Sequence, residues 1–455
     1  MKAHRQLTVV IKLGSSSIVD EITHQPILSV LTLIVETAVK LHQNGHRVVI
    51  VSSGAIAVGL RRMNIEKKPK VLARVQALAA VGQCRLISLW DSLFAHLLQP
   101  VAQILLTRND IADRTQYLNA QNTFAELFSM GVIPIVNEND TLAVSEIKFG
   151  DNDTLSAITA AMVQADYLFL MTDVDCLYDK NPRTNPDAQP IEVVDDISSL
   201  VADVSSSGSN LGTGGMSTKI VAARLATSAG VTTVITRSSK PGNIVEIVDH
   251  VQASKQAVSL ASSFSTDPTD TPPLSSSASS LQPEAAPKPP LHTRFLPDPH
   301  PIRDRSFWLL HGLAAHGTIF IDDGAHRALV SKAGLLPVGI VKVEGTFSQQ
   351  EAVRIVVLHG VRQNTTTAAR PNGFPASTRT VTAEHDSEAG GIIAEPVEVG
   401  RALVNYSSVE IARIKGLQST EIQSVLGYAD SEYVALRENI SLEKVSRPVT
   451  PGRDT

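Results

Sequence analysis

The sequence predicts an α/β protein with a mainly parallel sheet sandwiched between helices, followed by a small β-rich domain of the barrel type. Three observations carry this prediction. Strand-like and helix-like stretches alternate through the first 257 residues. The strand-like stretches are continuous apolar runs, which is typical of parallel strands covered on both faces. Beyond residue 303 the pattern changes to short strands separated by turns, which indicates a second, β-rich unit.

The N-terminal elements follow one another in regular order. The β-branched run Leu7–Leu13 predicts a strand. A helix is predicted over Pro26–Gln43, because apolar residues recur there at helical spacing and Gly45 follows its end. The further strands are expected at Arg47–Val51, Val101–Leu106, Val132–Val136, Tyr167–Met171 and Val231–Thr236. The helices between them are expected at Val71–Leu98, Thr115–Met130, Asp153–Gln164 and Ser217–Ala229.

The distribution of proline divides the chain. Ten of the 24 prolines lie between Pro268 and Pro301, in a segment dominated by Ser, Pro and Ala. Such a segment buries too little apolar surface to offset its ordering entropy, so we interpret 258–302 as a disordered linker rather than a long ordered loop. The linker separates a first domain, 1–257, from a second, 303–440. Within the second domain, short strands are expected at Gly317–Ile321, Val338–Val343 and Ala352–Leu358, and 363–394 is a low-complexity insertion. Residues 441–455 form a tail.

Composition excludes several classes of protein. The formal net charge of −5 does not fit a general nucleic-acid binder. Two cysteines are too few for a disulfide scaffold and fit a reducing compartment. No apolar run is long enough to span a bilayer, and Lys12 interrupts the short apolar stretch near the N-terminus. We therefore expect a cytoplasmic protein without a signal peptide or membrane contact.

Polar residues gather where the predicted parallel strands end. Four strands are followed by the segments Lys12–Ser16, Ser52–Gly54, Asn137–Asp140 and Thr172–Asp173. Ligands of open α/β sheets bind beyond the carboxyl ends of the strands. The four segments are therefore expected to form one shared site.

Lys12 and Lys219 are the two cationic candidates for this site. A lysine that ends a buried strand is costly unless it meets an anion, although its amine could also reach water. Gly14 allows the backbone close to a ligand. Lys219 falls in the first turn of a predicted helix, where it opposes the helix dipole unless a phosphate lies between them. The glycines before that helix could instead form a plain surface loop. Together the two lysines favour a nucleoside triphosphate site without a Walker motif.

Carboxylates and amides are crowded into the segments 136–140 and 148–153. These side chains could hold a hard cation, form a solvated acidic loop, or recognise a zwitterion through its ammonium and carboxylate groups. Spacing alone does not distinguish the three.

Several segments carry a resemblance to a known family. They are VIKLGSSS (10–17), VIVSSGAIAVG (49–59), AAVGQCRLISLW (79–90), LLTRNDIADRTQYLNAQNT (105–123), PIVNENDTLAVSEIKFGDND (134–153), LMTDVDCLYDKNPRTNP (170–186) and GTGGMSTK (212–219). Through them, residues 7–249 resemble the glutamate 5-kinases of the amino-acid kinase superfamily. Segments 317–325, 336–342 and 416–428 resemble the PUA domain that follows the kinase in many members. Cys176 and Asn181 depart from the family pattern, and the linker and insertion are similar to elaborations of fungal members.

The resemblance implies ATP-dependent phosphorylation of the γ-carboxylate of L-glutamate to L-glutamyl 5-phosphate, the first step of proline biosynthesis, with Mg²⁺ as a cofactor. It implies catalytic roles for Lys12, Lys219 and Asp153, and no metal-ligating residue is assigned. The ATP-binding residues that it implies are Lys12, Gly14, Thr172, Asp173, Gly212, Thr213, Gly214, Gly215, Met216, Ser217 and Lys219. The glutamate-binding residues that it implies are Ser53, Asp140 and Asn152.

The resemblance also implies partners and leaves alternatives. Proline as a feedback inhibitor, a glutamyl-phosphate reductase that takes up the product, and a homo-dimer or homo-tetramer are all implied. One alternative is another carboxylate kinase of the superfamily. The other is an RNA-binding PUA protein with a degenerate kinase domain. Residues 316–361 balance four basic against four acidic side chains, so nucleic-acid binding is not expected.

Overall fold

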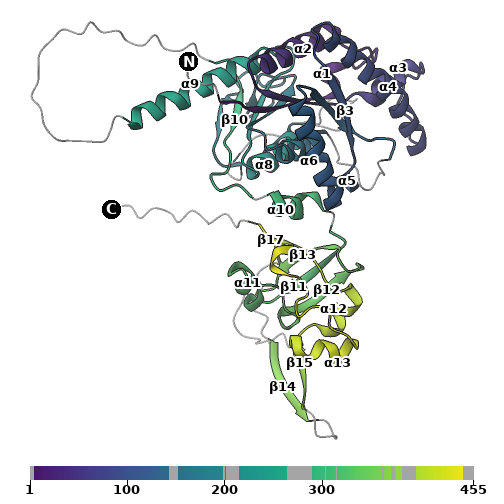
Figure 1. Ribbon diagram of the computed structural model, residues 1–455, viewed down its shortest axis with the longest axis vertical. Coiled ribbons are helices and arrows are strands. Elements are labelled where there is room, and N and C mark those ends of the chain that lie inside the picture. Colours follow the sequence, from purple (N-terminus) through teal and green to yellow (C-terminus); the bar gives the residue numbers. More distant parts are fainter. Residues whose placement is uncertain are drawn as a thin grey trace, which may run out of the picture. The chain divides into compact units, whose positions relative to one another are not determined.

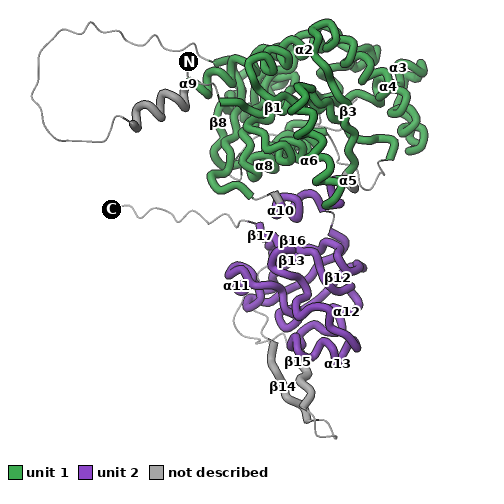
Figure 2. The backbone as a smooth tube through the Cα atoms, viewed as in Figure 1, with its two compact units in different colours: residues 1–110, 114–302 green, residues 111–113, 303–455 purple. Residues whose placement is uncertain are grey.

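A computed structural model describes residues 5–142, 152–197, 200, 215–263, 289–302, 304–313, 315–359, 363–369, 375–381 and 396–443. The chain divides into two compact units (Figure 2). The first comprises residues 1–110 and 114–302, and the second comprises 111–113 and 303–455. Among the described residues, no helix combines the length and the apolar character that crossing a bilayer requires.

The first unit is built around an eight-stranded sheet (Figure 1). In spatial order its strands are β3 (Val101–Leu106), β4 (Ile133–Glu138), β2 (Arg47–Ser52), β1 (Thr8–Leu13), β5 (Tyr167–Thr172), β9 (Thr232–Arg237), β10 (Thr293–Phe295) and β8 (Val193–Val194). Neighbouring strands pair in parallel, except that β10 runs antiparallel to β9. The mainly parallel sheet predicted from the apolar runs is confirmed.

Helices cover both faces of this sheet. Their bounds are α1 (Ser15–Ile18), α2 (Leu28–Gln43), α3 (Ala55–Arg62), α4 (Leu72–Ala95), α5 (Arg108–Ala112), α6 (Arg114–Ser129), α7 (Asn152–Met162), α8 (Met216–Ser228) and α9 (Asn243–Ser263). Successive strand residues point to opposite faces. Val9, Ile11 and Leu13 share a core with α2, α4 and α9. Lys12 therefore points to the opposite face, where α7 lies against β1.

One short antiparallel pairing, between β6 (Leu177–Tyr178) and β7 (Pro190–Ile191), completes the unit near the sheet edge. The adjoining strand β10 lies inside the segment 258–302, which the sequence predicts to be a disordered linker. Thr293 is fully buried, and its hydroxyl accepts a hydrogen bond from the Leu177 amide at 2.7 Å and donates to the Ile191 carbonyl at 2.6 Å. Helix α9 also continues to Ser263. The prediction of disorder is wrong for the end of α9 and for β10. Nothing in the sequence marks β10, because a strand of three residues held by hydrogen bonds has no apolar run to recognise. Residues 264–288 lie outside the described part of the chain.

The second unit contains a five-stranded sheet, which confirms the expected β-rich domain. Its order is β12 (Ile340–Gly345), β11 (Gly317–Ile321), β13 (Ala352–Val357), β16 (Val397–Leu403) and β17 (Ile440–Leu442). Its helices are α10 (Asp304–Phe307), a π-helical turn (Trp308–Gly312), α11 (Asp323–Val330), α12 (Ser408–Ile414) and α13 (Ile422–Leu426). Within the predicted insertion 363–394, β14 (Gln363–Ala369) pairs with β15 (Pro375–Val381). The rest of that insertion and the tail beyond residue 443 are outside the described residues.

Candidate active site

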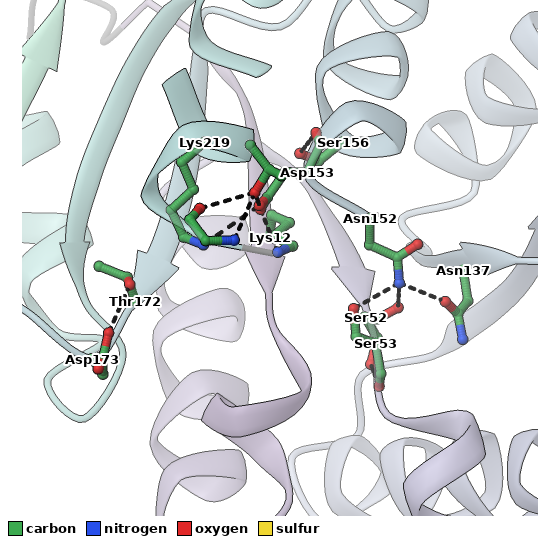
Figure 3. A network of polar contacts seen from close by, with 12 residues as sticks. Lys12, Ser52, Ser53, Asn137, Asn152, Asp153, Ser156, Thr172, Asp173 and Lys219 are labelled. Atoms are coloured by element: carbon green, nitrogen blue, oxygen red, sulfur yellow. Dashed lines mark hydrogen bonds and ion pairs between the residues drawn. The ribbon is translucent and has the colours of Figure 1, made fainter. Parts of the chain in front are cut away.

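Polar side chains converge beyond the carboxyl ends of β1, β2, β4 and β5, as the sequence predicts (Figure 3). The N-termini of α7 and α8 reach the same edge of the sheet, because their first residues bond to groups on these strands or to one another. Two polar clusters result. One contains Lys12, Asp153 and Lys219, and the other contains Ser53, Asn137 and Asn152.

The first cluster is two lysines that share one carboxylate. The Lys12 ammonium is ion-paired with Oδ1 of Asp153, and Nζ of Lys219 lies 3.4 Å from Oδ2. All three residues are buried, with relative exposures of 3% for Lys12, 0% for Asp153 and 7% for Lys219. The structure thus brings together three residues that stand far apart in the sequence.

Local structure explains why Asp153 can hold this position. Asp153 lies in the first turn of α7, where free backbone amides and the helix dipole favour a carboxylate. Thr218 in the first turn of α8 donates a hydrogen bond to Oδ2 at 2.8 Å and accepts one from the Gly215 amide at 3.0 Å. Thr218 therefore joins the start of α8 to the carboxylate that Lys219 also contacts.

The charge state of Asp153 follows from its surroundings. Burial on its own would raise the pKa of the carboxyl group, since it penalises the charged form. The ammonium groups of Lys12 and Lys219 outweigh this effect and, with the hydrogen bonds from Lys12 and Thr218, lower the pKa to about 2. Asp153 is consequently an anion at neutral pH and does not serve as a proton acceptor.

Gly14 leaves space beside the first lysine. Its φ of −74° is open to any residue, so the glycine is not required by the backbone conformation. A Cβ built there would lie 3.8 Å from Nζ of Lys12. That distance is an ordinary van der Waals contact, so the role of Gly14 in approaching a ligand stays a prediction.

The second cluster is centred on the Asn152 amide. Its Nδ2 lies 2.6 Å from Oγ of Ser53, 2.9 Å from Oδ1 of Asn137 and 3.1 Å from the carbonyl oxygen of Ser52. Its Oδ1 is buried and has no hydrogen-bond partner among the described residues. An unpaired buried acceptor is costly, and it lies on the side of the amide away from Ser53 and Asn137 (Figure 3). Such an acceptor suits a ligand that carries N–H groups.

The remaining predicted residues divide between described and undescribed parts of the chain. Asp140 is partly buried just beyond β4. Thr172 ends β5, and its hydroxyl donates to Asp173 at 3.1 Å. Gly215 caps α8, and Met216 and Ser217 form its first turn. The predicted nucleotide residues Gly212, Thr213 and Gly214 lie outside the described residues.

Sequence reasoning did not assign roles to Thr218, Asn137 or Arg183. Thr218 and Asn137 fall inside the segments that carried the resemblance, so their position was available but their contacts were not. Arg183 forms an ion pair with Asp173 across ten residues of chain. In the sequence, Arg183 is one of several charged residues in a polar segment, and nothing marks it as a partner of Asp173.

Comparison with known proteins agrees with this architecture. Residues 7–237 match the model of the amino acid kinase family, and residues 317–426 match that of the PUA domain. The chain is 51% identical to a probable glutamate 5-kinase of Schizosaccharomyces pombe, over 96% of this chain and 93% of that one. It is 49% identical to an uncharacterized protein of Saccharomyces cerevisiae, over 95% and 98% of the two chains. It is 43% identical to a glutamate 5-kinase of Cyanothece sp., over 96% and 99%.

Proposed function

The chain belongs to the amino acid kinase family, and we propose that it transfers the γ-phosphoryl group of ATP to the γ-carboxylate of L-glutamate. The product, L-glutamyl 5-phosphate, opens the biosynthesis of proline. The observation that carries this proposal is the pair of buried lysines on one carboxylate, at the edge of the sheet where the acceptor-side amides also lie. Relatives named as glutamate 5-kinases cover almost the whole chain, which supports the choice of glutamate.

The chemistry requires cations rather than a base. A glutamate side chain has a pKa of about 4.3, so the nucleophile is already ionised at neutral pH. The barrier then arises from bringing an anionic carboxylate in line with an anionic phosphate. Lys12 and Lys219 would neutralise that repulsion as the phosphoryl group is transferred, and Asp153 would hold their ammonium groups at a fixed separation.

The second cluster suits the amino-acid end of the acceptor. The unpaired Oδ1 of Asn152 can accept a hydrogen bond from an α-ammonium group. Asp140 would add a negative charge on the same side, and Ser53 a hydroxyl group. This distribution would favour the ammonium group near the second cluster and would leave the side-chain carboxylate of the acceptor to extend toward the lysines.

ATP would bind on the β5 side of the site, with its phosphates at the start of α8. The residues that would hold it are Lys12, Gly14, Thr172, Asp173, Gly215, Met216, Ser217 and Lys219, with Gly212, Thr213 and Gly214. Among the described residues, no three acidic, histidine or cysteine side chains gather as a metal site would need. When bound, Mg²⁺ would supply further positive charge to the phosphates, whose oxygens are among the ligands it commonly takes in such sites.

Regulation and partners extend the proposal. L-proline would act as a feedback inhibitor, and a reductase would consume the reactive acyl phosphate in the cytoplasm. The kinase would form dimers or tetramers, and the PUA domain would serve as a structural or regulatory module rather than as an RNA-binding one.

A coupled assay of ADP release tests the function directly. Glutamate, aspartate and N-acetylglutamate are offered in parallel, each with and without proline. Turnover with glutamate alone is expected, since the other two carry either a shorter side chain or a blocked amine. Faster turnover with aspartate or N-acetylglutamate would reassign the enzyme to a sister kinase, and salt-sensitive RNA binding without kinase activity would favour the PUA alternative.

A further inference from the structure

Helix α4 contacts the second cluster through one side chain and the adjoining Ser52 through another, although it lies outside the strand ends that define the site. Oε1 of Gln83 accepts a hydrogen bond from Nδ2 of Asn137 at 2.8 Å. Nε1 of Trp90 donates to Oγ of Ser52 at 3.2 Å. Gln83 and Trp90 are seven positions apart and so lie on one face of α4. Ser52 is the last residue of β2 and Asn137 the last but one of β4, and the two strands are paired, so one helix face contacts both strand ends.

Backbone groups determine which way the two asparagine amides point. The Glu138 amide is an obligatory donor and lies 2.9 Å from Oδ1 of Asn137. The Ser52 carbonyl is an obligatory acceptor and lies 3.1 Å from Nδ2 of Asn152. With Oδ1 of Asn137 fixed in this way, its Nδ2 must find an acceptor on the opposite side. Oε1 of Gln83 is that acceptor.

The orientation of Asn137 has a consequence for Asn152. Oδ1 of Asn137 accepts from Nδ2 of Asn152 as well as from the Glu138 amide. An Asn137 side chain that loses its bond to Gln83 is held through Oδ1 alone and rotates more readily, since the other end of its amide is then unpaired. The rotation would remove one of the oxygens that hold Nδ2 of Asn152, and Oδ1 of Asn152 would lose its fixed direction.

Two glycines place α4 close enough for Gln83 to reach. A Cβ on Gly82 would lie 1.7 Å from the Ala55 carbonyl oxygen, and one on Gly59 would lie 2.0 Å from the Leu78 carbonyl oxygen. Both obstructing atoms belong to the backbone, so neither can move aside cheaply. Helices α3 and α4 therefore touch backbone to backbone beside residue 83. This close contact sets the distance that a glutamine side chain spans to β4.

We propose that Gln83 is a positioning residue for the amino-acid acceptor, acting through Asn137 on Asn152. This inference rests on the proposed function, because it assigns Asn152 to the acceptor. Gln83 itself touches neither substrate. Its effect is expected on the KM for glutamate and not on the KM for ATP, since all the contacts described here belong to the second cluster.

Kinetics of Gln83→Met, Asn137→Ala and the double variant test the proposal. Methionine keeps the length of the side chain but offers no comparable acceptor. We expect Gln83→Met to raise the KM for glutamate about tenfold, the equivalent of one lost hydrogen bond. The KM for ATP should change less than about twofold. In the Asn137→Ala background the same substitution should raise the KM for glutamate by less than about twofold, because residues acting through one another are not additive.

The matched control is Gln99→Met. Gln99 is buried and precedes β3, at the amino ends of the strands and away from the candidate site. Its amide donates to the carbonyls of Pro100 and Gly131. Its loss should lower the melting temperature without changing the KM for glutamate. Unchanged kinetics in a folded Gln83→Met variant, equal rises in both KM values, or additive effects in the double variant would each overturn the proposal.

Crystal structures of the wild type and Gln83→Met separate this inference from the proposed function. If the wild type phosphorylates no glutamate, the function is wrong, and the amide orientations still decide whether Gln83 positions Asn137. A turned Asn137 amide in the variant supports the positioning role. An Asn137 that keeps both of its Oδ1 contacts without Gln83 overturns it.

Discussion

Replacing Asp153 by asparagine removes the carboxylate that both site lysines contact while almost preserving the volume of the side chain. Asp153 is fully buried, and each of its oxygens faces one ammonium group. In the variant, the charges of Lys12 and Lys219 lie close together across a neutral amide. The perturbation therefore changes the electrostatics of the site more than its shape.

The structure gives the scale of the effect. The two ammonium groups and the hydrogen bonds to the carboxylate outweigh burial and lower the pKa of Asp153 from 3.8 to about 2. At about 1.4 kcal/mol per pKa unit, this difference favours the ionised form by roughly 2 kcal/mol. Removing one partner of a buried ion pair costs about 3–5 kcal/mol. We expect the free energy of unfolding to fall by about 3 kcal/mol, and kcat to fall about a hundredfold, because the lysines lose the group that orients them.

The assay combines ADP release with thermal unfolding in the presence and absence of ATP. Because the triphosphate supplies negative charge to the unpaired lysines, ATP should raise the melting temperature of Asp153→Asn more than that of the wild type. Asp166→Asn is the matched control, since Asp166 bonds to the Thr8 amide and to Arg5 before β1. A variant Asp153→Asn with a kcat within about threefold of the wild type would refute the organising role of Asp153.

Three further substitutions test other parts of the molecule. Lys219→Ala should lower kcat by about a hundredfold or more if its charge acts mainly in the transition state, and near-normal turnover would remove it from the mechanism. Asp140→Ala should raise the KM for glutamate in steady-state kinetics, whereas a change confined to the KM for ATP would contradict its placement on the acceptor side. Burial, with a smaller contribution from Arg401, lowers the pKa of His311 from 6.5 to about 4. The unfolded chain therefore takes up this proton first as the pH falls, and stability should drop by about 2 kcal/mol between pH 7 and 5. His311→Phe should abolish this drop in urea unfolding curves, and an unaltered pH dependence would contradict it.

Much of the first unit was predictable because burial leaves a strong signal in the sequence. A parallel strand covered on both faces is a continuous apolar run, and a polar residue that follows it marks the carboxyl end. Lys12, Asn137 and Thr172 were placed at one edge for this reason, since parallel strands bring their ends together. Strand β10 lacked the signal. Its three residues are held by backbone pairing with β9 and by the hydrogen bond that the Thr293 hydroxyl accepts from the Leu177 amide. The prolines around them suggested disorder.

Gln83 illustrates what the sequence could not provide. On α4 it is followed by two exposed residues, Cys84 and Arg85, so its polarity reads as part of a solvent face. Its contact with Asn137 depends on the packing of α3 against α4, which Gly59 and Gly82 allow. Neither helix position nor side-chain type encodes that spacing. Contacts of this kind arise from the packing between elements, whereas the sequence pattern describes each element separately.

The two lysines show how a sound electrostatic argument can be incomplete. Lys12 at a buried strand end and Lys219 at a helix start each require an anion, and the sequence suggested a phosphate for both. The structure supplies Asp153 instead. Two ammonium groups against one carboxylate leave a single net positive charge among these three buried side chains. Without the carboxylate, two bare cations would destabilise the fold before any ligand arrived, and with a second carboxylate the site would no longer attract an anion. One shared aspartate therefore limits the cost of burying two lysines and still leaves a net positive charge that can bind a phosphate.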